Sequence, residues 1–178
     1  MVGMILGGIA ILVLVVFVGT VGFGAPYVPS REGEAREAFR KLKPLSGRDV
    51  VVDFGCGEGV ILRVAKDLGT RGAVGIEINP VLAMIAKFRN RGREGVEVRW
   101  GDMRRVRLPE GMTVAYVFGV ERVMRMLLPR LEEFAREHKR DIWVMSLAFE
   151  FAGRKYEKRW GAYYLFRIKG ATRRGERQ

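Results

Sequence analysis

The most specific segment of this sequence is a glycine-rich loop that directly follows a short β-branched run. The run covers residues 50–54, and the loop continues as Gly55-Cys56-Gly57-Glu58-Gly59. Glycines at a strand-to-helix turn allow a ligand to approach the backbone closely, because they carry no Cβ atom and accept positive φ angles. The loop therefore indicates an α/β fold with a ligand site at the end of its first strand.

Segments with strand and helix patterns alternate along the chain around this loop. We expect strands at 50–54, 73–78, 96–100, 113–118, 142–147 and 162–168, and helices at 35–42, 61–68, 79–88, 121–128 and 129–138. Such alternation predicts a Rossmann-like α/β domain whose mostly parallel sheet is covered by helices on both faces. The stretch between the last two expected strands is short.

The N-terminal segment has a different character. Residues 1–30 carry no charged side chain, and residues 1–23 supply the roughly 20 apolar residues that a helix needs to cross a bilayer. We therefore divide the chain into a transmembrane anchor (1–23), a linker (24–30), the α/β domain (31–170) and a basic tail (171–178). The positive-inside rule predicts a single-pass membrane protein with its domain in the cytoplasm.

The net charge of +12 is concentrated in two stretches. Residues 87–107 contain eight basic and three acidic residues, and residues 154–178 contain nine and two, which accounts for the whole excess. Such stretches attract anionic lipid headgroups, nucleic acid or an acidic partner, and charge alone does not choose among them. The single cysteine, Cys56, excludes an internal disulfide, and the single histidine, His138, leaves too few soft ligands for zinc, so we expect no metal site.

The acids around the glycine loop indicate the kind of ligand. The glycines are spaced Gly-x-Gly-x-Gly, unlike the Gly-x-Gly-x-x-Gly of NAD sites, and Asp53 and Glu58 flank them. A carboxylate repels a pyrophosphate and attracts a ligand that carries an ammonium and a sulfonium group. We therefore predict that Asp53, Gly55, Gly57 and Glu58 bind S-adenosylmethionine rather than NAD or ATP.

Two further acids follow the next expected strands. Glu77 lies at the end of the second strand, 20 residues after Gly57, and its carboxylate can accept both ribose hydroxyls. Asp102 follows the third strand, where it can accept from the adenine amino group. Ligands of open α/β sheets bind beyond the carboxyl ends of the strands, which is where these acids are expected. Glu77, Asp102 and their neighbours Ile78 and Met103 thus join the predicted cofactor site.

With these residues, the chain resembles a class I, seven-β-strand S-adenosylmethionine-dependent methyltransferase over residues 49–168. More narrowly, it resembles the archaeal protein-lysine methyltransferases and their membrane-anchored relatives, which in eukaryotes methylate lysine on mitochondrial membrane proteins. The narrower resemblance is carried by Pro26-Tyr27-Val28-Pro29-Ser30, by residues 73–79 and by residues 121–131. It implies that the Tyr27 segment folds over the methionine end of the cofactor.

The substrate side departs from that family. The short stretch between the last two expected strands implies a shortened C-terminal part, in which some of the family's usual substrate-side structure is missing. This chain reads Ser146-Leu147-Ala148-Phe149-Glu150 where relatives carry Ser-His-Glu-Phe-Glu, and Ser30 stands where they carry threonine. Phe118-Gly119-Val120 occupies the place of the Asn-Pro-Pro-Tyr-like motif of enzymes that methylate DNA bases or glutamine, which argues against those substrates. The departures leave the cofactor site intact and concern the substrate that is methylated.

In methyl transfer, the main task of the protein is to position the substrate. The reaction is an in-line displacement, so the enzyme mainly orients a nucleophile whose lone pair is free. A lysine amine must first lose its proton, which a dry pocket beside a sulfonium favours. Phe118, which we also place at the cofactor, is predicted to orient the amine by a cation–π contact, with Tyr116 or Tyr27 as alternatives. For Tyr116 we prefer core packing. No residue qualifies as a general base, so the catalytic residues stay unassigned.

The sequence therefore predicts an S-adenosylmethionine-dependent protein-lysine N-methyltransferase. We expect a monomer that acts on a protein at or near the membrane, without a nucleic-acid partner. Three alternatives stay open. The anchor also fits a phospholipid or small-molecule methyltransferase, and the basic stretches fit an RNA methyltransferase, although a membrane tether suits RNA poorly. Leu147 and Ala148 are compatible with a tethered module that binds the cofactor without turnover.

Overall fold

The computed structural model describes residues 3, 7 and 31–170. The predicted anchor 1–23 (apart from residues 3 and 7), the linker 24–30 with Tyr27, and the tail 171–178 lie outside the described residues, so the predictions made for them stay predictions. In the part of the chain that is described, no helix combines the length and the hydropathy needed to cross a membrane.

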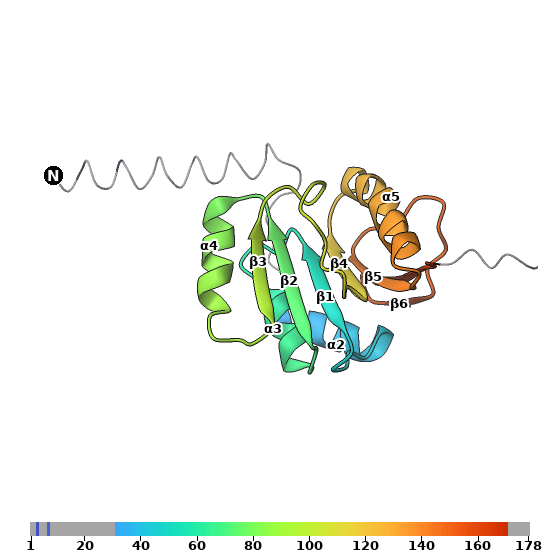
Figure 1. The fold of residues 1–178 in the computed structure, drawn as a ribbon, viewed down its shortest axis with the longest axis horizontal. Coiled ribbons are helices and arrows are strands. Elements are labelled where there is room, and N and C mark those ends of the chain that lie inside the picture. Colours follow the sequence, from blue (N-terminus) through green and yellow to red (C-terminus); the bar gives the residue numbers. More distant parts are fainter. Residues whose placement is uncertain (1–2, 4–6, 8–30, 171–178) are drawn as a thin grey trace, which may run out of the picture.

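The domain is built on one seven-stranded sheet with the order β3-β2-β1-β4-β5-β7-β6 (Figure 1). The strands are β1 (Val50–Phe54), β2 (Gly72–Glu77), β3 (Val96–Trp100), β4 (Val114–Phe118), β5 (Ile142–Leu147), β6 (Lys158–Trp160) and β7 (Tyr163–Ile168). Strands β1 to β5 form the parallel part of the sheet. Strand β7 runs antiparallel to both of its neighbours, β5 and β6. The predicted mostly parallel sheet is confirmed, with β6 as a strand that the sequence did not indicate.

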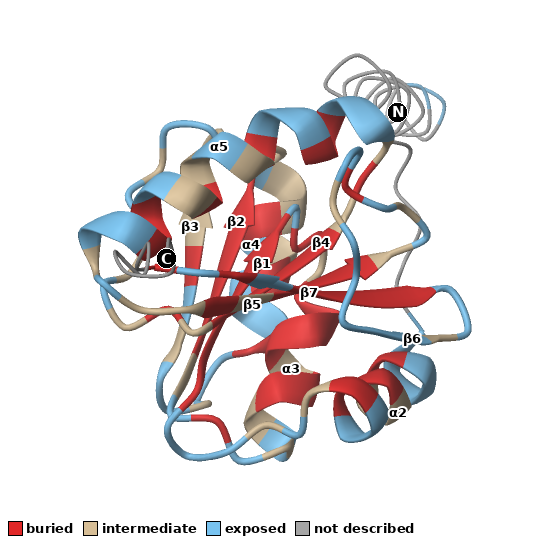
Figure 2. Ribbon diagram, turned by 90° about the vertical axis from the view of Figure 1, so that its right-hand side faces the viewer, coloured by how far each residue is buried: buried red, intermediate tan, exposed pale blue. Residues whose placement is uncertain are grey.

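The helices of the described domain cover both faces of this sheet. They are α2 (Glu32–Leu42), α3 (Val60–Asp67), α4 (Pro80–Arg89) and α5 (Glu121–Glu137). Buried side chains of α2, α3 and α4 share one hydrophobic core with the sheet, whereas those of α5 belong to a second core. Figure 2 shows α5 on one side of the buried strands and α2 and α3 on the other. The predicted layer arrangement is therefore also confirmed.

Helix α5 differs from the prediction of two segments, 121–128 and 129–138. It continues without a break through Pro129. A proline inside a helix removes one hydrogen bond and costs about 3 kcal/mol. Leu127 and Leu131, on either side of it, are both buried against the sheet, and each contributes about 1.5–3 kcal/mol. Burial of the apolar stripe therefore outweighs the break that the proline alone would favour.

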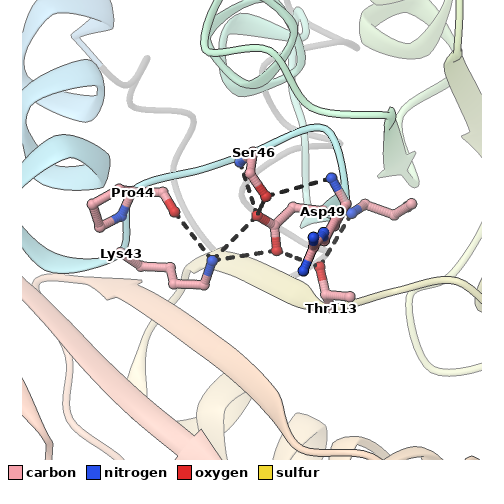
Figure 3. Close-up of polar contacts among 7 residues, drawn as sticks. Lys43, Pro44, Ser46, Asp49 and Thr113 are labelled. Carbon is pink, nitrogen blue, oxygen red and sulfur yellow. Dashed lines mark hydrogen bonds and ion pairs between the residues drawn. The ribbon is translucent and has the colours of Figure 1, made fainter.

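A polar cluster fixes the start of β1, at the edge of the sheet away from the glycine loop (Figure 3). The Asp49 carboxylate accepts hydrogen bonds from Thr113 Oγ1 and from the backbone N–H of Ser46, both at 2.9 Å, and pairs with Lys43 Nζ at 3.2 Å. Thr113 Oγ1 also accepts from the N–H of Val50 at 3.1 Å, which links β1 to the start of β4. Burial raises the pKa of Asp49, but the hydrogen bonds and the Lys43 charge together outweigh it, so the pKa lies below its usual value.

The register of the parallel strands brings the predicted site residues to one edge of the sheet. β1 lies between β2 and β4, and Asp53 pairs with Gly75 on one side and with Tyr116 on the other. At the ends of β2 and β3, Glu77 pairs with Trp100. The chain runs outward from β1 to β3 and then returns to β4 on the other side of β1. This reversal is the switch point at which open α/β sheets bind ligands.

Candidate functional site

The glycine loop turns sharply between β1 and α3. The N–H groups of Gly55 and Cys56 both donate to the carbonyl oxygen of Ile76, at 2.8 and 3.0 Å, so the loop is fastened to the end of β2. Gly55 and Gly57 have φ angles of +87° and +53°, a region in which side chains with a Cβ atom are strained. The conformation of the loop itself therefore requires glycine at both positions.

The Glu77 side chain connects the ends of β1 and β2. Its Oε2 accepts from the backbone N–H of Gly57 at 2.8 Å, and its Oε1 accepts from the N–H of Asn79 at 2.9 Å. The residue is buried, and each carboxylate oxygen keeps a second acceptor position. Ile78, the next residue, is partly exposed beside it. Glu77 is thus held in a fixed orientation, and its carboxylate oxygens can still accept hydrogen bonds from hydroxyl donors.

Two acidic side chains, Asp53 and Glu77, are buried close together at this point. Burial, and then the charge of Glu77, raise the pKa of Asp53 well above its usual range. Burial also raises the pKa of the Cys56 thiol, and the charges of Asp53 and Glu77 add to that effect. Neither carboxyl group has an ion-pair partner within residues 31–170. A cationic ligand fits such a site, and a polyphosphate does not. No three His, Cys, Asp or Glu side chains gather as metal ligands in the described part of the chain.

Asp102 lies in the turn after β3, and its carboxylate is in contact with Arg104. Its Oδ1 accepts from the Arg104 backbone N–H at 2.8 Å, and the Arg104 guanidinium forms an ion pair with it. Hydrogen bonds from Arg104 lower the pKa of Asp102. The neighbouring Met103 Cε lies 3.8 Å from the position that a Cβ atom on Gly55 would take, so the turn packs against the glycine loop. An adenine amino group would have to share or displace Arg104, and the predicted role of Asp102 stays a prediction.

The remaining predicted residues lie at different depths. Glu58 is turned toward α4, where its carboxylate pairs with Arg89 at 2.5 Å. Phe118 ends β4 beside the end of β5 and is partly buried. Tyr116 is 1% exposed and packs against Phe39 with 6.1 Å between the ring centroids. The prediction that Tyr116 is a core residue is therefore confirmed. Phe118 is the aromatic residue at the C-terminal end of β4.

Two side chains at this edge were not singled out from the sequence. The indole N–H of Trp100 donates to the carbonyl oxygen of Ile78 at 3.0 Å, although the tryptophan is 65% exposed. Asn90 is buried at the end of α4, and its Nδ2 donates to the carbonyl of Gly59 at 3.4 Å. A Cβ atom on Gly59 would lie 2.4 Å from that nitrogen. The tryptophan at a strand end was an available signal, whereas the contact of Asn90 with Gly59 depends on the fold.

The departure from the family motif after β5 lies in a tight turn. Ser146 Oγ donates to the carbonyl of Phe149 at 2.6 Å, and the N–H of Ala148 donates to the carbonyl of Ala162 at 2.8 Å. Ala148 has a φ angle of +69°, which is uncommon for a residue with a Cβ atom. Strained backbone of this kind persists where the surrounding structure holds it, often at functional sites. The turn follows the C-terminal end of β5, on the same edge of the sheet as the acids.

Two comparisons of the sequence with known proteins bear on this geometry. The sequence model of a family described as the ANTKMT methyltransferase domain matches residues 53–158. A protein-lysine N-methyltransferase of Saccharolobus islandicus (strain REY15A) is 37% identical over 134 residues, which cover 72% of this chain and 79% of that protein. A ribosomal protein L11 methyltransferase of Histophilus somni (strain 2336) is 44% identical over 55 residues, 31% of this chain and 18% of that protein.

A comparison of the fold with solved structures agrees with the sequence matches. An RNA methyltransferase from Salinibacter ruber in complex with S-adenosyl-L-homocysteine superposes with a TM-score of 0.71 and 23% sequence identity. The match covers 85% of this chain and 100% of that chain. At this level of identity the likeness shows the class I methyltransferase fold and nothing about the substrate.

The residues of this edge fit the cofactor of that fold. A buried pair of carboxyl groups beside a glycine loop suits S-adenosylmethionine, which carries positive charge and ribose hydroxyls. The family match covers more than half of the chain, and the archaeal relative is similar over most of its own length. The chain is therefore an S-adenosylmethionine-dependent methyltransferase and belongs to the ANTKMT methyltransferase domain family.

Proposed function

We propose that this enzyme is a protein-lysine N-methyltransferase, which methylates the side-chain amine of a lysine on another protein. The observation that carries the proposal is the 37% identity with the protein-lysine N-methyltransferase of Saccharolobus islandicus over 72% of this chain. The family match supports it, because it extends to residue 158, beyond the turn that follows β5. A protein substrate is thus favoured over lipid, RNA or a small molecule.

The proposed cofactor site lies at the C-terminal ends of β1, β2, β3 and β4. When bound, S-adenosylmethionine supplies an electrophilic methyl group on its sulfonium. The remaining acceptor positions of Glu77 take the ribose hydroxyls, and the buried Asp53 favours a cationic ligand because a nearby positive charge stabilises its carboxylate form. The proposed members of the site are Tyr27, Asp53, Gly55, Gly57, Glu58, Glu77, Ile78, Asp102, Met103 and Phe118.

The lysine must arrive as a neutral amine. Its ordinary pKa is about 10.4, so most of the amine is protonated at neutral pH. Apolar surroundings at the ends of β4 and β5, including Phe118, disfavour the ammonium and lower this pKa. Within the described residues, the single histidine, His138, lies at the end of α5 and its Nδ1 contacts the Phe134 carbonyl at 3.0 Å. Solvent is therefore the proposed proton acceptor, and the rate should rise with pH through the neutral range.

We further propose that residues 1–23 anchor the enzyme in a membrane as a single span, with the domain in the cytoplasm. Support comes from the absence of charge in residues 1–30 and from the basic residues that follow. A tether of this kind restricts the enzyme to proteins in or near the same membrane. The domain needs no second copy to complete its sheet, and we propose a monomer.

The test is methyl transfer by the full-length protein. Membranes from cells that lack it are incubated with the protein and tritiated S-adenosylmethionine, and the label is then followed in protein, lipid and RNA. Label in protein, located on lysine by mass spectrometry, is the expected result, and Glu77→Ala is the matched inactive control. Label in lipid or RNA would contradict the proposal. Cofactor binding without label in any fraction would contradict it as well, in favour of a tethered binding module.

A further inference from the structure

Helix α4 has an apolar face that points away from the domain. Ala83 and Ala86 are buried against the sheet, whereas Met84 is 65% exposed and Phe88 is 74% exposed. Met84 and Phe88 are four residues apart, so they lie side by side on one face of the helix. A surface helix of a soluble domain normally carries polar residues on its outer face. The exposed apolar side chains of α4 therefore indicate an interaction surface.

The apolar face extends beyond these two side chains. Val81 and Ile85, on the same outer half of α4, are each only partly buried. Figure 1 shows α4 at one end of the molecule, beside the edge strand β3. Contiguous exposed apolar side chains rimmed by polar ones mark interaction surfaces. We call Val81, Met84, Ile85 and Phe88 the outer face of α4.

Cations border this outer face. Lys87 and Arg91 are exposed, and within residues 31–170 neither forms an ion pair. Arg89 is also exposed, and it is bound to Glu58 at 2.5 Å. The stretch 87–107, which begins on α4, has eight basic and three acidic residues. The partner of this surface must therefore accept apolar side chains and offer negative charge at the same time.

We propose that the outer face of α4 lies on the surface of an anionic lipid bilayer. Met84 and Phe88 enter the boundary between headgroups and acyl chains, and Lys87 and Arg91 contact the anionic headgroups. Interfacial helices combine bulky apolar residues and basic residues in this way, and basic residues near an anionic surface strengthen the attraction. The proposal concerns the orientation of the domain and does not depend on lysine being the substrate.

Other occupants match the surface less well. In a two-fold dimer the same surface of each copy forms the interface. The basic border of the outer face, Lys87 and Arg91, would then lie close to the basic border of the second copy, and the like charges would repel each other. Single-stranded RNA stacks its bases on planar side chains, and of the outer face only Phe88 is planar. Trp100 and Ile78 are exposed nearby, but they belong to the edge that holds the proposed cofactor site, so they are not part of this surface.

The position of α4 gives the contact a consequence for the enzyme. α4 begins at Pro80, three residues after Glu77 and at the edge of the sheet with the acids. Asn79 caps it by accepting hydrogen bonds from the N–H groups of Val81 and Leu82 at 2.9 and 3.2 Å. A bilayer along the outer face therefore lies beside the cofactor edge. Substrate residues close to the membrane surface are then within reach, and residues far from it are not.

The test places a fluorophore on the surface in the full-length protein. Met84→Cys and Phe88→Cys are labelled with an environment-sensitive dye, and Met126→Cys on α5, also an exposed methionine, is the matched control. Native Cys56 is buried with a raised thiol pKa, so it stays unlabelled. The proteins are placed in phosphatidylcholine vesicles with or without phosphatidylserine, and lipids with a quencher in the acyl chain are added. Cofactor titration checks that each labelled protein is folded.

The expected result is several-fold stronger quenching at positions 84 and 88 than at 126, only with phosphatidylserine, and reduced by Lys87→Glu combined with Arg91→Glu. Equal quenching at the three positions, or none at 84 and 88, overturns the proposal. A dye shift caused by RNA in place of vesicles, or by protein concentration without lipid, overturns it in favour of those partners. Quenching is measured without turnover, so failure of the lysine assignment would leave this result unchanged.

Discussion

The carboxylate of Glu77 accepts the backbone N–H of Gly57 at 2.8 Å, so the last residue of β2 holds the glycine loop that follows β1. The same carboxylate holds Asn79, at the start of α4, through its other oxygen. One side chain therefore fixes the two loops between which the cofactor is proposed to lie. Its removal should affect both ligand contacts and the shape of the loop.

Glu77→Ala is expected to weaken binding of S-adenosylmethionine strongly. The variant loses the proposed ribose contacts, and each charge-assisted hydrogen bond to a buried group contributes about 1–3 kcal/mol. Calorimetric titration of the full-length protein measures the affinity. Glu110→Ala, which removes an exposed carboxylate paired with Arg107, is the control and should leave the affinity unchanged. Equal affinities of wild type and Glu77→Ala would show that the site has been misplaced.

Gly57→Val tests the backbone of the loop separately from its acids. Gly57 has a φ angle of +53°, where a β-branched side chain costs about 1–3 kcal/mol, and the loop that contains it is the proposed cofactor-binding loop. Gly69→Val is the matched control, because Gly69 has a φ angle of +83° and no atom near the new Cβ position. Both variants should lose stability in urea unfolding, and only Gly57→Val should lose cofactor binding in the same titration. Loss of binding in both would point to general unfolding.

The placement of Asp53, Glu77 and Asp102 could be predicted from the sequence because it follows from two simple regularities. Strand patterns locate the end of each strand, and parallel strands bring those ends to one edge of the sheet. The pairing of Asp102 with Arg104 follows no such regularity. This ion pair depends on the conformation of the turn after β3, because loop backbone, unlike a helix or strand, does not fix the relative direction of two side chains two positions apart.

The exposed face of α4 could not be predicted for a different reason. Apolar residues occupy nearly every position from Pro80 to Ile85, so the helical period does not distinguish the buried side from the outer one. In the structure the small Ala83 and Ala86 face the sheet, where close packing is possible, and the larger Met84 and Phe88 face outward. The buried side is thus decided by the space between α4 and β3, which is a property of the packed fold.

The raised pKa of Asp53 predicts that binding of the cationic cofactor releases protons. In the free protein, burial and then the charge of Glu77 keep the Asp53 carboxyl group protonated to a higher pH than usual. A nearby positive charge favours the carboxylate and lowers this pKa again. Calorimetry in buffers of different ionisation enthalpy should therefore show proton release with S-adenosylmethionine.

S-adenosylhomocysteine, which lacks the sulfonium charge, provides the comparison for this experiment. It should release fewer protons than S-adenosylmethionine, and Asp53→Asn should abolish the difference between the two ligands. Binding should also tighten as pH rises, up to the raised pKa of Asp53 in the free protein. Equal proton release with both ligands would mean that the sulfonium lies outside the field of Asp53.

Asp49 should make the folding stability of the domain decrease as pH falls. Hydrogen bonds and Lys43 hold its pKa below the usual value despite burial, so the folded state favours the carboxylate. The stabilisation is fully present above the unfolded pKa, about 3.9, and is lost as pH falls through the lower folded pKa. Asp49→Asn removes the charge and leaves Lys43 and Thr113 with weaker partners, at a cost of about 1–3 kcal/mol near neutral pH.

Urea unfolding of wild type and Asp49→Asn across the acid range measures the contribution of Asp49 to the free energy of unfolding. The free-energy difference between wild type and Asp49→Asn should stay constant above about pH 5 and shrink progressively below the unfolded pKa. Asp53 is present in both proteins, so its own pH dependence cancels in the difference. Thr113→Val removes one hydrogen bond to Asp49 and should therefore shift the midpoint of the loss to higher pH. A difference independent of pH would show that Asp49 contributes through packing, because a paired carboxylate must lose its advantage once it is protonated.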